Sequence, residues 1–277
     1  MRIDLHSHSN ASDGTDPPAE VMRRARAGGL DVIALTDHDT LAGIGQARRA
    51  LPPGLTLVPG MELSCRLDGH SVHLLAYHAD PAQAGLAGQL QAITTDRLRR
   101  ARDMVTKLRD LGVDITWEQV AAIAGDGVVG RPHIARAMVE AGAIARPQQA
   151  FTPDWIGPGG RAYVGRYALD PEEAVRLVSA AGGVSVLAHP ALPARGWVIG
   201  DEVIERLARA GLGGLEVAHP DQDGAQRIRL AALAASLGLV CSGGSDDHGA
   251  LTGYRLGCET TAPGEYERLM SLAANAH

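Results

Sequence analysis

Short apolar runs, each followed by a polar turn, recur along this chain and constrain its fold more than any other feature. In "DVIALTDHD" an aliphatic stretch gives way to Asp37, His38 and Asp39. Runs of this length, bounded by Gly, Pro or Asp, are typical of strands buried in a sheet. The seven segments are "RIDLHSH", "DVIALTDHD", "LTLVPGMEL", "SVHLLAYH", "GGVSVLAHP", "GGLEVAHP" and "GLVCSGGSDDH".

Stretches with helical character separate most of these segments. Alternation of strands and helices predicts an α/β fold with a parallel sheet. Seven strand-like segments favour a closed or distorted barrel over an open sheet. The expected helices cover Pro17–Ala27, Asp39–Ala50, Pro171–Ala181, Asp201–Ala210 and Ala225–Leu237.

The stretch from residue 81 to 163 lacks a strand-like run. Apolar residues at helical spacing, such as Leu98, Ala101, Val105 and Leu108, predict a helix there. Thr116 and Gln119 form a capping-box pattern, and "GRPH" at 130–133 is suited to a helix start. We therefore expect a barrel formed by residues 1–80 and 164–277, and a helical insertion at 81–163 that acts as a cap over the active-site face.

Composition excludes several classes of protein. The formal charge of −6 argues against a protein that coats nucleic acid. The sequence contains no run of about eighteen apolar residues, so we expect no membrane-spanning helix. Asp4, His6 and His8 interrupt the position where a signal peptide would be apolar. Three widely spaced cysteines do not make a disulfide framework, so we expect a cytoplasmic protein. Lys107 is the only lysine, which disfavours Schiff-base chemistry.

Histidines and carboxylates gather where the expected strands end. His6 and His8 are two residues apart, so on a strand their side chains face the same side, as a metal chelator requires. The carboxyl ends of strands form the active face of α/β barrels. Nine side chains are candidate metal ligands by this reasoning: His6, His8, Asp13, His38, Glu62, His73, His189, Asp246 and His248.

Six histidines and three carboxylates suit two or three divalent ions, and the mixture of nitrogen and oxygen favours Mn, Zn or Fe. Such ions would make the site attract anions. His73 and His78 lie five residues apart, so only one of them can face the metals. We expect His219 to line the pocket and Cys65 to be packed rather than to bind metal.

The segments "DLHSHSNASDG", "ALTDHD", "GMELSC", "VHLLAY", "LAHP" and "GGSDDH" closely resemble the polymerase and histidinol phosphatase (PHP) family. The resemblance implies a distorted (β/α)7 barrel with a metal cluster that hydrolyses phosphate esters. It places a first metal on His6, His8, Glu62 and Asp246, and Glu62 then bridges to a second metal on His73 and His189. It places a third metal on Asp13, His38 and His248, with Asp13 where some members have histidine.

The insertion motif "GRPHIARAMVEAG" resembles the subgroup that removes the 3′-phosphate of nucleoside 3′,5′-bisphosphates to leave nucleoside 5′-monophosphates. Close relatives in that subgroup trim short 5′-phosphorylated RNA from its 5′ end, which is the nearest alternative. A histidinol-phosphate phosphatase is a second alternative, although Arg131 would disfavour its cationic substrate. A metal-stabilised accessory module without activity is the third.

Four residues are candidate substrate contacts. Arg131 and His133 lie at a helix start that attracts anions, and Ser7 and Asn10 lie in the first metal loop. Arg161 and Arg166 are weaker candidates. We expect a hydroxide that bridges two ions, Mn(II) above all, to attack phosphorus, with His189 or His248 as proton donor. The expected partner is a small nucleotide or a short oligoribonucleotide, with no membrane and no obligate protein partner.

Overall fold

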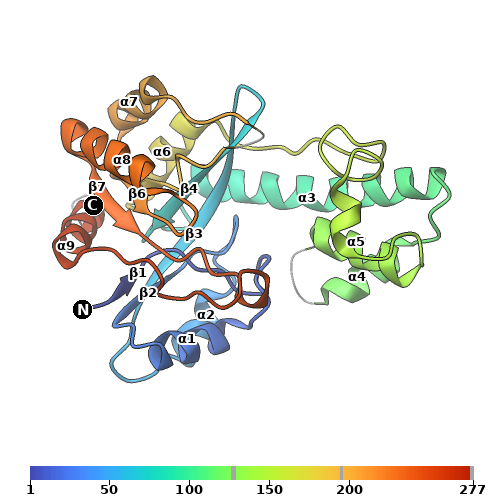
Figure 1. Ribbon diagram of the computed structural model, residues 1–277, viewed down its shortest axis with the longest axis horizontal. Coiled ribbons are helices and arrows are strands. Elements are labelled where there is room, and N and C mark those ends of the chain that lie inside the picture. Colours follow the sequence, from blue (N-terminus) through green and yellow to red (C-terminus); the bar gives the residue numbers. More distant parts are fainter. Residues whose placement is uncertain (126–128, 194–195, 275–277) are drawn as a thin grey trace. The chain divides into compact units, whose positions relative to one another are not determined.

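The computed structural model describes residues 1–125, 129–193 and 196–274, which divide into two compact units. The first unit, residues 1–89 and 168–277, contains a sheet of seven strands that follow one another in chain order (Figure 1). The strands are β1 (Ile3–Asp4), β2 (Val32–Leu35), β3 (Thr56–Leu67), β4 (His70–Tyr77), β5 (Val184–Leu187), β6 (Gly214–Ala218) and β7 (Val240–Gly243).

The two edge strands approach each other, so the sheet is a nearly closed barrel. Leu5 N donates to Gly243 O at 3.2 Å, and Asp246 N donates to His6 O at 2.9 Å. At Gly244 a Cβ would lie 2.4 Å from Cβ of His6, so only glycine allows this approach. The distorted seven-stranded barrel expected from the sequence is confirmed.

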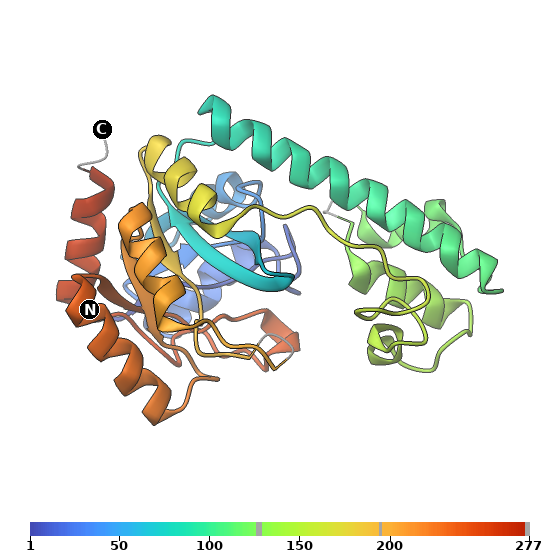
Figure 2. The same cartoon turned by 90° about the horizontal axis from the view of Figure 1, so that it is seen from above.

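Helices surround this barrel, and each of the expected ones is present (Figure 2). The second starts at Ile44 rather than at Asp39. Asp39 has a φ of 56°, outside the helical range, and its Oδ1 accepts a hydrogen bond from Ser64 N at 2.7 Å. The helices are α1 (Pro18–Ala27), α2 (Ile44–Arg49), α6 (Pro171–Ala180), α7 (Asp201–Ala210), α8 (Gly224–Leu237), α9 (Pro263–Ala274) and the short 3-10 helix η2 (Gly249–Leu251).

The expectation of a wholly parallel sheet is wrong at β4, which is antiparallel to both β3 and β5. A two-residue turn joins β3 to β4, and its residues Asp68 and Gly69 have φ values of 48° and 84°. A turn with both φ values positive produces a tight antiparallel hairpin. The hairpin brings His73 on β4 directly opposite Ser64, two residues beyond Glu62 on β3.

Apolar side chains fill the interior of the barrel next to the part of β3 that precedes Glu62. They come from β1, β2, β3, β4, β5 and β7 and include Ile3, Val58, Leu75, Val186 and Val240, each at most 1 % exposed. Tyr77 is also buried, and its hydroxyl donates to Leu5 O at 2.7 Å. This packed core supports the polar residues that follow the strands.

The second unit, residues 90–167, is helical. It contains most of α3 (Ala84–Asp110), α4 (Trp117–Ala124), α5 (Arg131–Glu140) and the 3-10 helix η1 (Pro147–Phe151). Thr116 makes the predicted capping box with Gln119, and α5 begins at Arg131 as predicted. Its own core packs Met104, Leu108 and Ile134 together.

The units divide at 89/90 and 167/168, whereas the sequence indicated 80/81 and 163/164. The first boundary differs because α3 starts inside the barrel unit and runs continuously into the helical unit. That the helical unit covers the active-site face stays a prediction. None of the described helices is long and apolar enough to cross a membrane.

Candidate metal centre and active site

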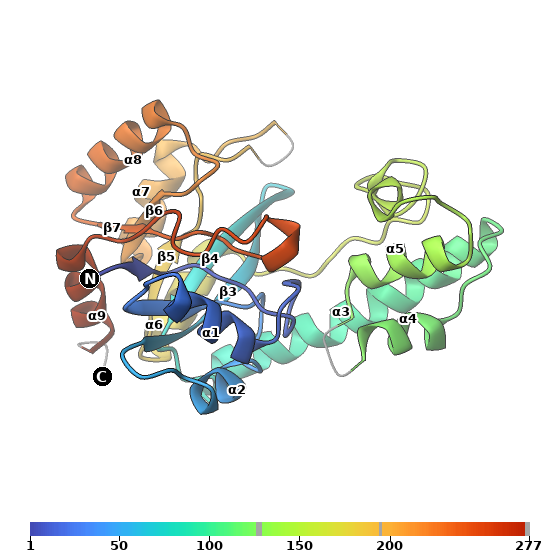
Figure 3. The ribbon, with the colours of Figure 1, turned by 60° about the horizontal axis from the view of Figure 1, so that its bottom comes forward.

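All nine predicted ligand residues belong to the barrel unit, and the structure brings them together. His6 and His8 follow β1, which ends at Asp4 and is shorter than the sequence suggested. Their side chains nevertheless lie together, with the two Nε2 atoms 3.1 Å apart. Of the remaining seven, Asp13 lies in the loop after β1, four follow β2, β5 or β7, and Glu62 and His73 lie in the middle of β3 and β4, strands that Figure 3 labels.

The first group consists of His6, His8, Glu62 and Asp246. Nε2 of His6 lies 3.3 Å from both Glu62 Oε2 and Asp246 Oδ1. Nε2 of His8 lies 3.2 Å from the same two oxygens. Two ring nitrogens and two carboxylate oxygens therefore converge on one point, which is the donor set that borderline divalent cations prefer.

The other oxygen of Glu62 faces a second set of histidines. Oε1 lies 2.8 Å from Nδ1 of His73 and 3.2 Å from Nε2 of His189. His38 also contacts Glu62, but through the oxygen that faces the first group, because its Nδ1 lies 3.2 Å from Glu62 Oε2; His38, Glu62 and His73 together form a further possible set of ligands. Glu62 is thus the residue that the first two groups share.

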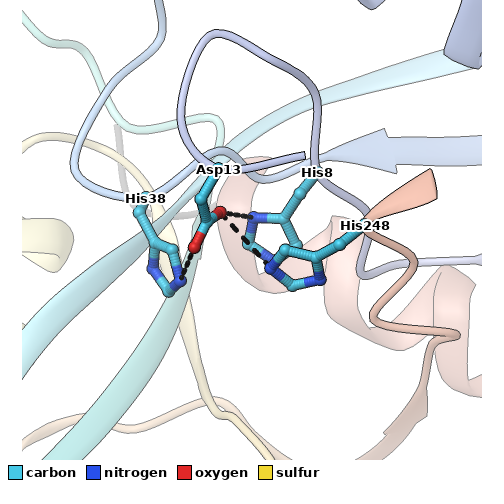
Figure 4. Close-up of side chains that lie close together, drawn as sticks. All are labelled: His8, Asp13, His38 and His248. Carbon is cyan, nitrogen blue, oxygen red and sulfur yellow. Dashed lines mark ion pairs between the residues drawn. The ribbon is translucent and has the colours of Figure 1, made fainter. Parts of the chain in front are cut away.

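Asp13 is the centre of a third group, together with His8, His38 and His248 (Figure 4). Oδ1 of Asp13 lies 3.3 Å from His248 Nε2 and 3.8 Å from His8 Nδ1, and Oδ2 lies 3.6 Å from His38 Nε2. The sequence reasoning did not include His8 in this group.

Strong mutual electrostatics accompany this geometry. Burial disfavours charge on His8, but hydrogen bonds to Asp246 and Glu62 outweigh it and raise the pKa of His8 to about 10. Burial also opposes ionisation of Glu62, yet the surrounding histidines hold the pKa of Glu62 well below its usual range. For His38 burial prevails and lowers the pKa to about 4. The cluster stabilises its carboxylates as anions, the form that binds cations.

Buried ring nitrogens test whether metal ions fit this cluster. Nδ1 of His8 and Nδ1 of His38 are both buried without a hydrogen bond to any described residue, although each lies beside a carboxylate oxygen. Buried polar atoms in proteins almost always have a partner. Each of these nitrogens faces a carboxylate oxygen, and cations held among such nitrogen and oxygen donors would supply partners that the chain itself does not, so the residues fit a cluster of divalent ions.

Several residues outside the predicted nine hold the ligands in place. Glu216 on β6 is fully buried; its Oε1 accepts from His6 Nδ1 at 2.9 Å, and its Oε2 accepts from His189 N at 2.8 Å. This bond leaves Nε2 of His6 free to face the first group. Glu216 was missed, although a lone carboxylate within the apolar run "GLEVA" was a signal for it.

His219 and Arg255 both contact Asp246. Nε2 of His219 lies 3.4 Å from Asp246 Oδ2, and Nη2 of Arg255 lies 3.5 Å from the same oxygen. His219 was expected only to line the pocket, and Arg255 was not expected at all.

Two of the proposed ligands have left-handed backbone angles: Asp246 has a φ of 48°, and His189 has a φ of 31°. Left-handed backbone at non-glycine residues is strained and concentrates at functional sites.

The loop after β1 is fixed by Asp37. Its carboxylate accepts hydrogen bonds from Ser9 N at 2.8 Å and from Ser12 Oγ at 2.7 Å, which places Asp13 beside the histidines. The expectation that Ser7 contacts the substrate is wrong. Ser7 alternates with His6 and His8, so it faces away from the cluster, and its buried hydroxyl donates to Ala34 O at 2.7 Å.

The remaining expectations fall on other parts of the chain. Asn10 is exposed in the loop after β1, and His78 points to a different place from His73, since it lines a cavity beside α2. In the helical unit Arg131 stacks on the ring of Phe151 at 5.6 Å. Nδ1 of His133 accepts from Gly130 N at 3.0 Å, so His133 closes the start of α5.

Comparisons with known proteins identify the family to which this chain belongs. Residues 4–88 match the model of the PHP domain. A 5′-3′ exoribonuclease of Haemophilus influenzae is 36 % identical over 89 % of this chain and 90 % of its own length. A 3′,5′-nucleoside bisphosphate phosphatase of Chromobacterium violaceum is 34 % identical over 91 % of this chain and 89 % of its own.

A solved structure shows that the similarity extends to the whole fold. A candidate metal-dependent phosphoesterase from Bifidobacterium adolescentis superimposes with a TM-score of 0.89 at 34 % identity, covering 98 % of this chain and 96 % of that one. The barrel, the cluster of histidines and carboxylates and these relatives lead to one conclusion: the chain belongs to the PHP family of metal-dependent phosphoesterases.

Proposed function

We propose that this enzyme removes the 3′-phosphate of nucleoside 3′,5′-bisphosphates and leaves nucleoside 5′-monophosphates. The observation that carries the proposal is the arrangement around Glu62, whose two oxygens face two separate sets of histidines. Similarity to the Chromobacterium violaceum phosphatase over most of both chains supports the choice of substrate.

Three sets of residues would hold two to three divalent ions, with Mn(II) as the ion we expect. His6, His8, Glu62 and Asp246 would hold the first; Glu62, His73 and His189 the second; and Asp13, His38 and His248 the third. Bound there, the ions would activate water and neutralise charge on the phosphoryl group. The mixed nitrogen and oxygen donors favour Mn(II), Zn(II) or Fe(II) over Ca(II).

The residues of the chain have distinct tasks in this reaction. Glu216 and Ser71 fix the rings of His6 and His73 through hydrogen bonds of 2.9 and 3.2 Å to their outward nitrogens. His189 and His248 are the candidates for delivering a proton to the leaving oxygen. We assign Asn10, Arg131 and His133 to the rest of the nucleotide, with Arg131 on the phosphate that is not hydrolysed and the helical insertion as a cap above it.

A second function shares the same cluster. Three similar proteins, from Haemophilus influenzae, Salmonella typhimurium and Escherichia coli, are 5′-3′ exoribonucleases. Cleavage of a phosphodiester needs the same metal chemistry but a longer binding groove. The two functions therefore differ in what lies beyond the metals and not in the metals themselves.

Parallel hydrolysis assays with added Mn(II) separate the two, with release of inorganic phosphate followed for the bisphosphate and release of nucleoside 5′-monophosphate followed for the RNA. Adenosine 3′,5′-bisphosphate and a 5′-phosphorylated RNA pentamer are assayed in parallel at equal concentration. Faster release from the bisphosphate supports the proposed function, and preferential trimming of the pentamer would make RNA end-processing the main activity. No hydrolysis of either substrate would refute both.

A further inference from the structure

The β3–β4 hairpin extends beyond the metal cluster and carries an arginine on its inner side. Side chains of a strand alternate, so Glu62, Ser64 and Arg66 share one face. Val58, four residues before Glu62, lies in the core inside the barrel, which identifies this face as the inner one. Arg66 therefore lies on the cluster side of the hairpin, about 13 Å along the strand from Glu62 at the spacing of extended chain.

Cross-strand pairing gives independent support for this placement. Arg66 is directly opposite Ser71, and Ser64 is directly opposite His73. Directly opposed residues project on the same side of a sheet. The hydroxyl of Ser71 lies 3.2 Å from Nε2 of His73, whose Nδ1 contacts Glu62. Ser71 is therefore both the cross-strand neighbour of Arg66 and a hydrogen-bond partner of His73, a proposed metal ligand.

Arg66 differs from the other arginines near the site in having no carboxylate. Arg24 pairs with Asp16 at 2.8 Å, and Arg255 pairs with Asp221 at 3.1 Å. The half-buried guanidinium of Arg66 makes no hydrogen bond or ion pair with any residue that the structure describes. With no carboxylate of the described chain holding it, this guanidinium is available to bind an anion from outside the chain.

The tip of the β3–β4 hairpin packs against another part of the barrel unit. The rings of His70 and Trp197 stack with centroids 4.6 Å apart and planes 16° apart. Trp197 follows β5 in the chain, and this ring contact places it beside His70 at the tip of the hairpin. This stacking holds the end of the hairpin that presents Arg66.

A cation beside a cluster of divalent ions is repelled unless an anion lies between them. The planar guanidinium binds phosphate through paired hydrogen bonds, which makes phosphate the fitting anion. We propose that Arg66 binds a second phosphate of the substrate, the one that is not hydrolysed. This inference rests on the proposed function and adds a residue from the barrel itself that sets specificity for doubly phosphorylated substrates.

Two phosphates meet this description: the 5′-phosphate of the same nucleotide, and the next internucleotide phosphate of an oligoribonucleotide. The test uses Arg66→Gln, which removes the charge, and Arg66→Lys, which keeps the positive charge but cannot make the paired hydrogen bonds of a guanidinium. Arg49→Gln is the matched control, because Arg49 is exposed on α2. Thermal melting confirms that all variants are folded.

Binding of 5′-AMP and of adenosine is measured by titration calorimetry with Mn(II) present, and KM is measured for 3′-AMP, adenosine 3′,5′-bisphosphate, pApA and pApApA. We expect Arg66→Gln to weaken 5′-AMP binding and raise KM for the bisphosphate by about 10-fold or more, as loss of a charge-assisted contact does. Adenosine binding and kinetics with 3′-AMP stay unchanged, and Arg66→Lys lies in between.

Each other outcome decides the matter as well. A raised KM for pApApA alone, with pApA and 5′-AMP unaffected, assigns Arg66 to the next internucleotide phosphate. Unchanged values for all ligands in Arg66→Gln would overturn the proposal. If the wild type hydrolyses none of the substrates, the proposed function fails separately. In that case unchanged affinities for 5′-AMP and for intact pApApA still overturn the role of Arg66.

Discussion

Oε1 of Glu216 lies 2.9 Å from Nδ1 of His6, and both side chains are fully buried. This pair connects β6 to the residues after β1 and sets which nitrogen of His6 faces the cluster. Glu216 also accepts from the backbone of His189, so a single carboxylate orients two proposed ligands.

Replacing this carboxylate tests its role as a positioning residue. Glu216→Gln should lower the affinity for Mn(II) by about 10- to 100-fold, the usual effect of losing an outer partner of a ligating histidine. Activity at saturating Mn(II) should recover more than activity at limiting Mn(II). Titration of activity against Mn(II) measures this, and equal losses at all concentrations would contradict it. Glu205→Gln, on the exposed side of α7, is the control.

Metal content distinguishes the shared ligand from a peripheral one. Glu62 faces two groups of histidines, whereas Asp13 belongs to the third group alone. Glu62→Gln should therefore lose more metal per chain than Asp13→Asn, which should keep the ions of the first two sites. Elemental analysis of the purified variants after equilibration with Mn(II) gives the stoichiometries. A larger loss in Asp13→Asn would show that our assignment of the bridging residue is wrong.

Metal binding should release protons. The pKa of His8 in the metal-free protein is raised from 6.5 to about 10, so His8 is protonated at neutral pH and a metal ion must displace that proton. Apparent affinity should rise with pH towards 10. Calorimetry in buffers of different ionisation enthalpy counts the protons, and an enthalpy independent of the buffer would contradict this prediction.

The same shift affects the stability of the metal-free fold. A histidine whose pKa is raised on folding contributes stability below its unfolded pKa, and this contribution is lost as the pH rises. With chelator present, the melting temperature should fall between pH 6.5 and about 10. With Mn(II) present it should not fall in that range. A metal-free protein that becomes more stable over this interval would contradict the charge state assigned to His8.

The hydroxyl of Tyr77 stabilises the closure of the barrel. It donates to Leu5 O at 2.7 Å from a fully buried position. Tyr77→Phe leaves that carbonyl without its partner and should reduce the free energy of unfolding by about 1–3 kcal/mol. Urea denaturation measures the change. Tyr254→Phe is the control, because Tyr254 is 54 % exposed and should change stability little.

Much of the barrel and the site could be predicted because polar residues interrupt apolar strands at regular places. His6, His8, His38 and Asp246 each follow a buried run, and the ends of neighbouring strands meet at one face of a barrel. The positions of these residues in the sequence were therefore enough to predict that their side chains lie close together in the fold.

Other features depend on contacts that the sequence does not display. Glu216 and His6 are 210 residues apart, and only the closed sheet brings them together. The antiparallel β4 follows from a turn of two residues with positive φ at Asp68 and Gly69. Ser7 lies between two histidines in the sequence, but alternation of side chains turns it to the opposite face.

The most direct test of the central claim is release of inorganic phosphate from adenosine 3′,5′-bisphosphate by the wild type and by Asp246→Asn. Asp246 contacts both His6 and His8 in the first group, and its replacement should reduce turnover by more than about 100-fold with Mn(II) present. Circular dichroism and thermal melting should show an intact fold. Unchanged turnover in Asp246→Asn, or wild-type turnover that persists after removal of all divalent metal, would contradict a metal-dependent phosphoesterase built on this cluster.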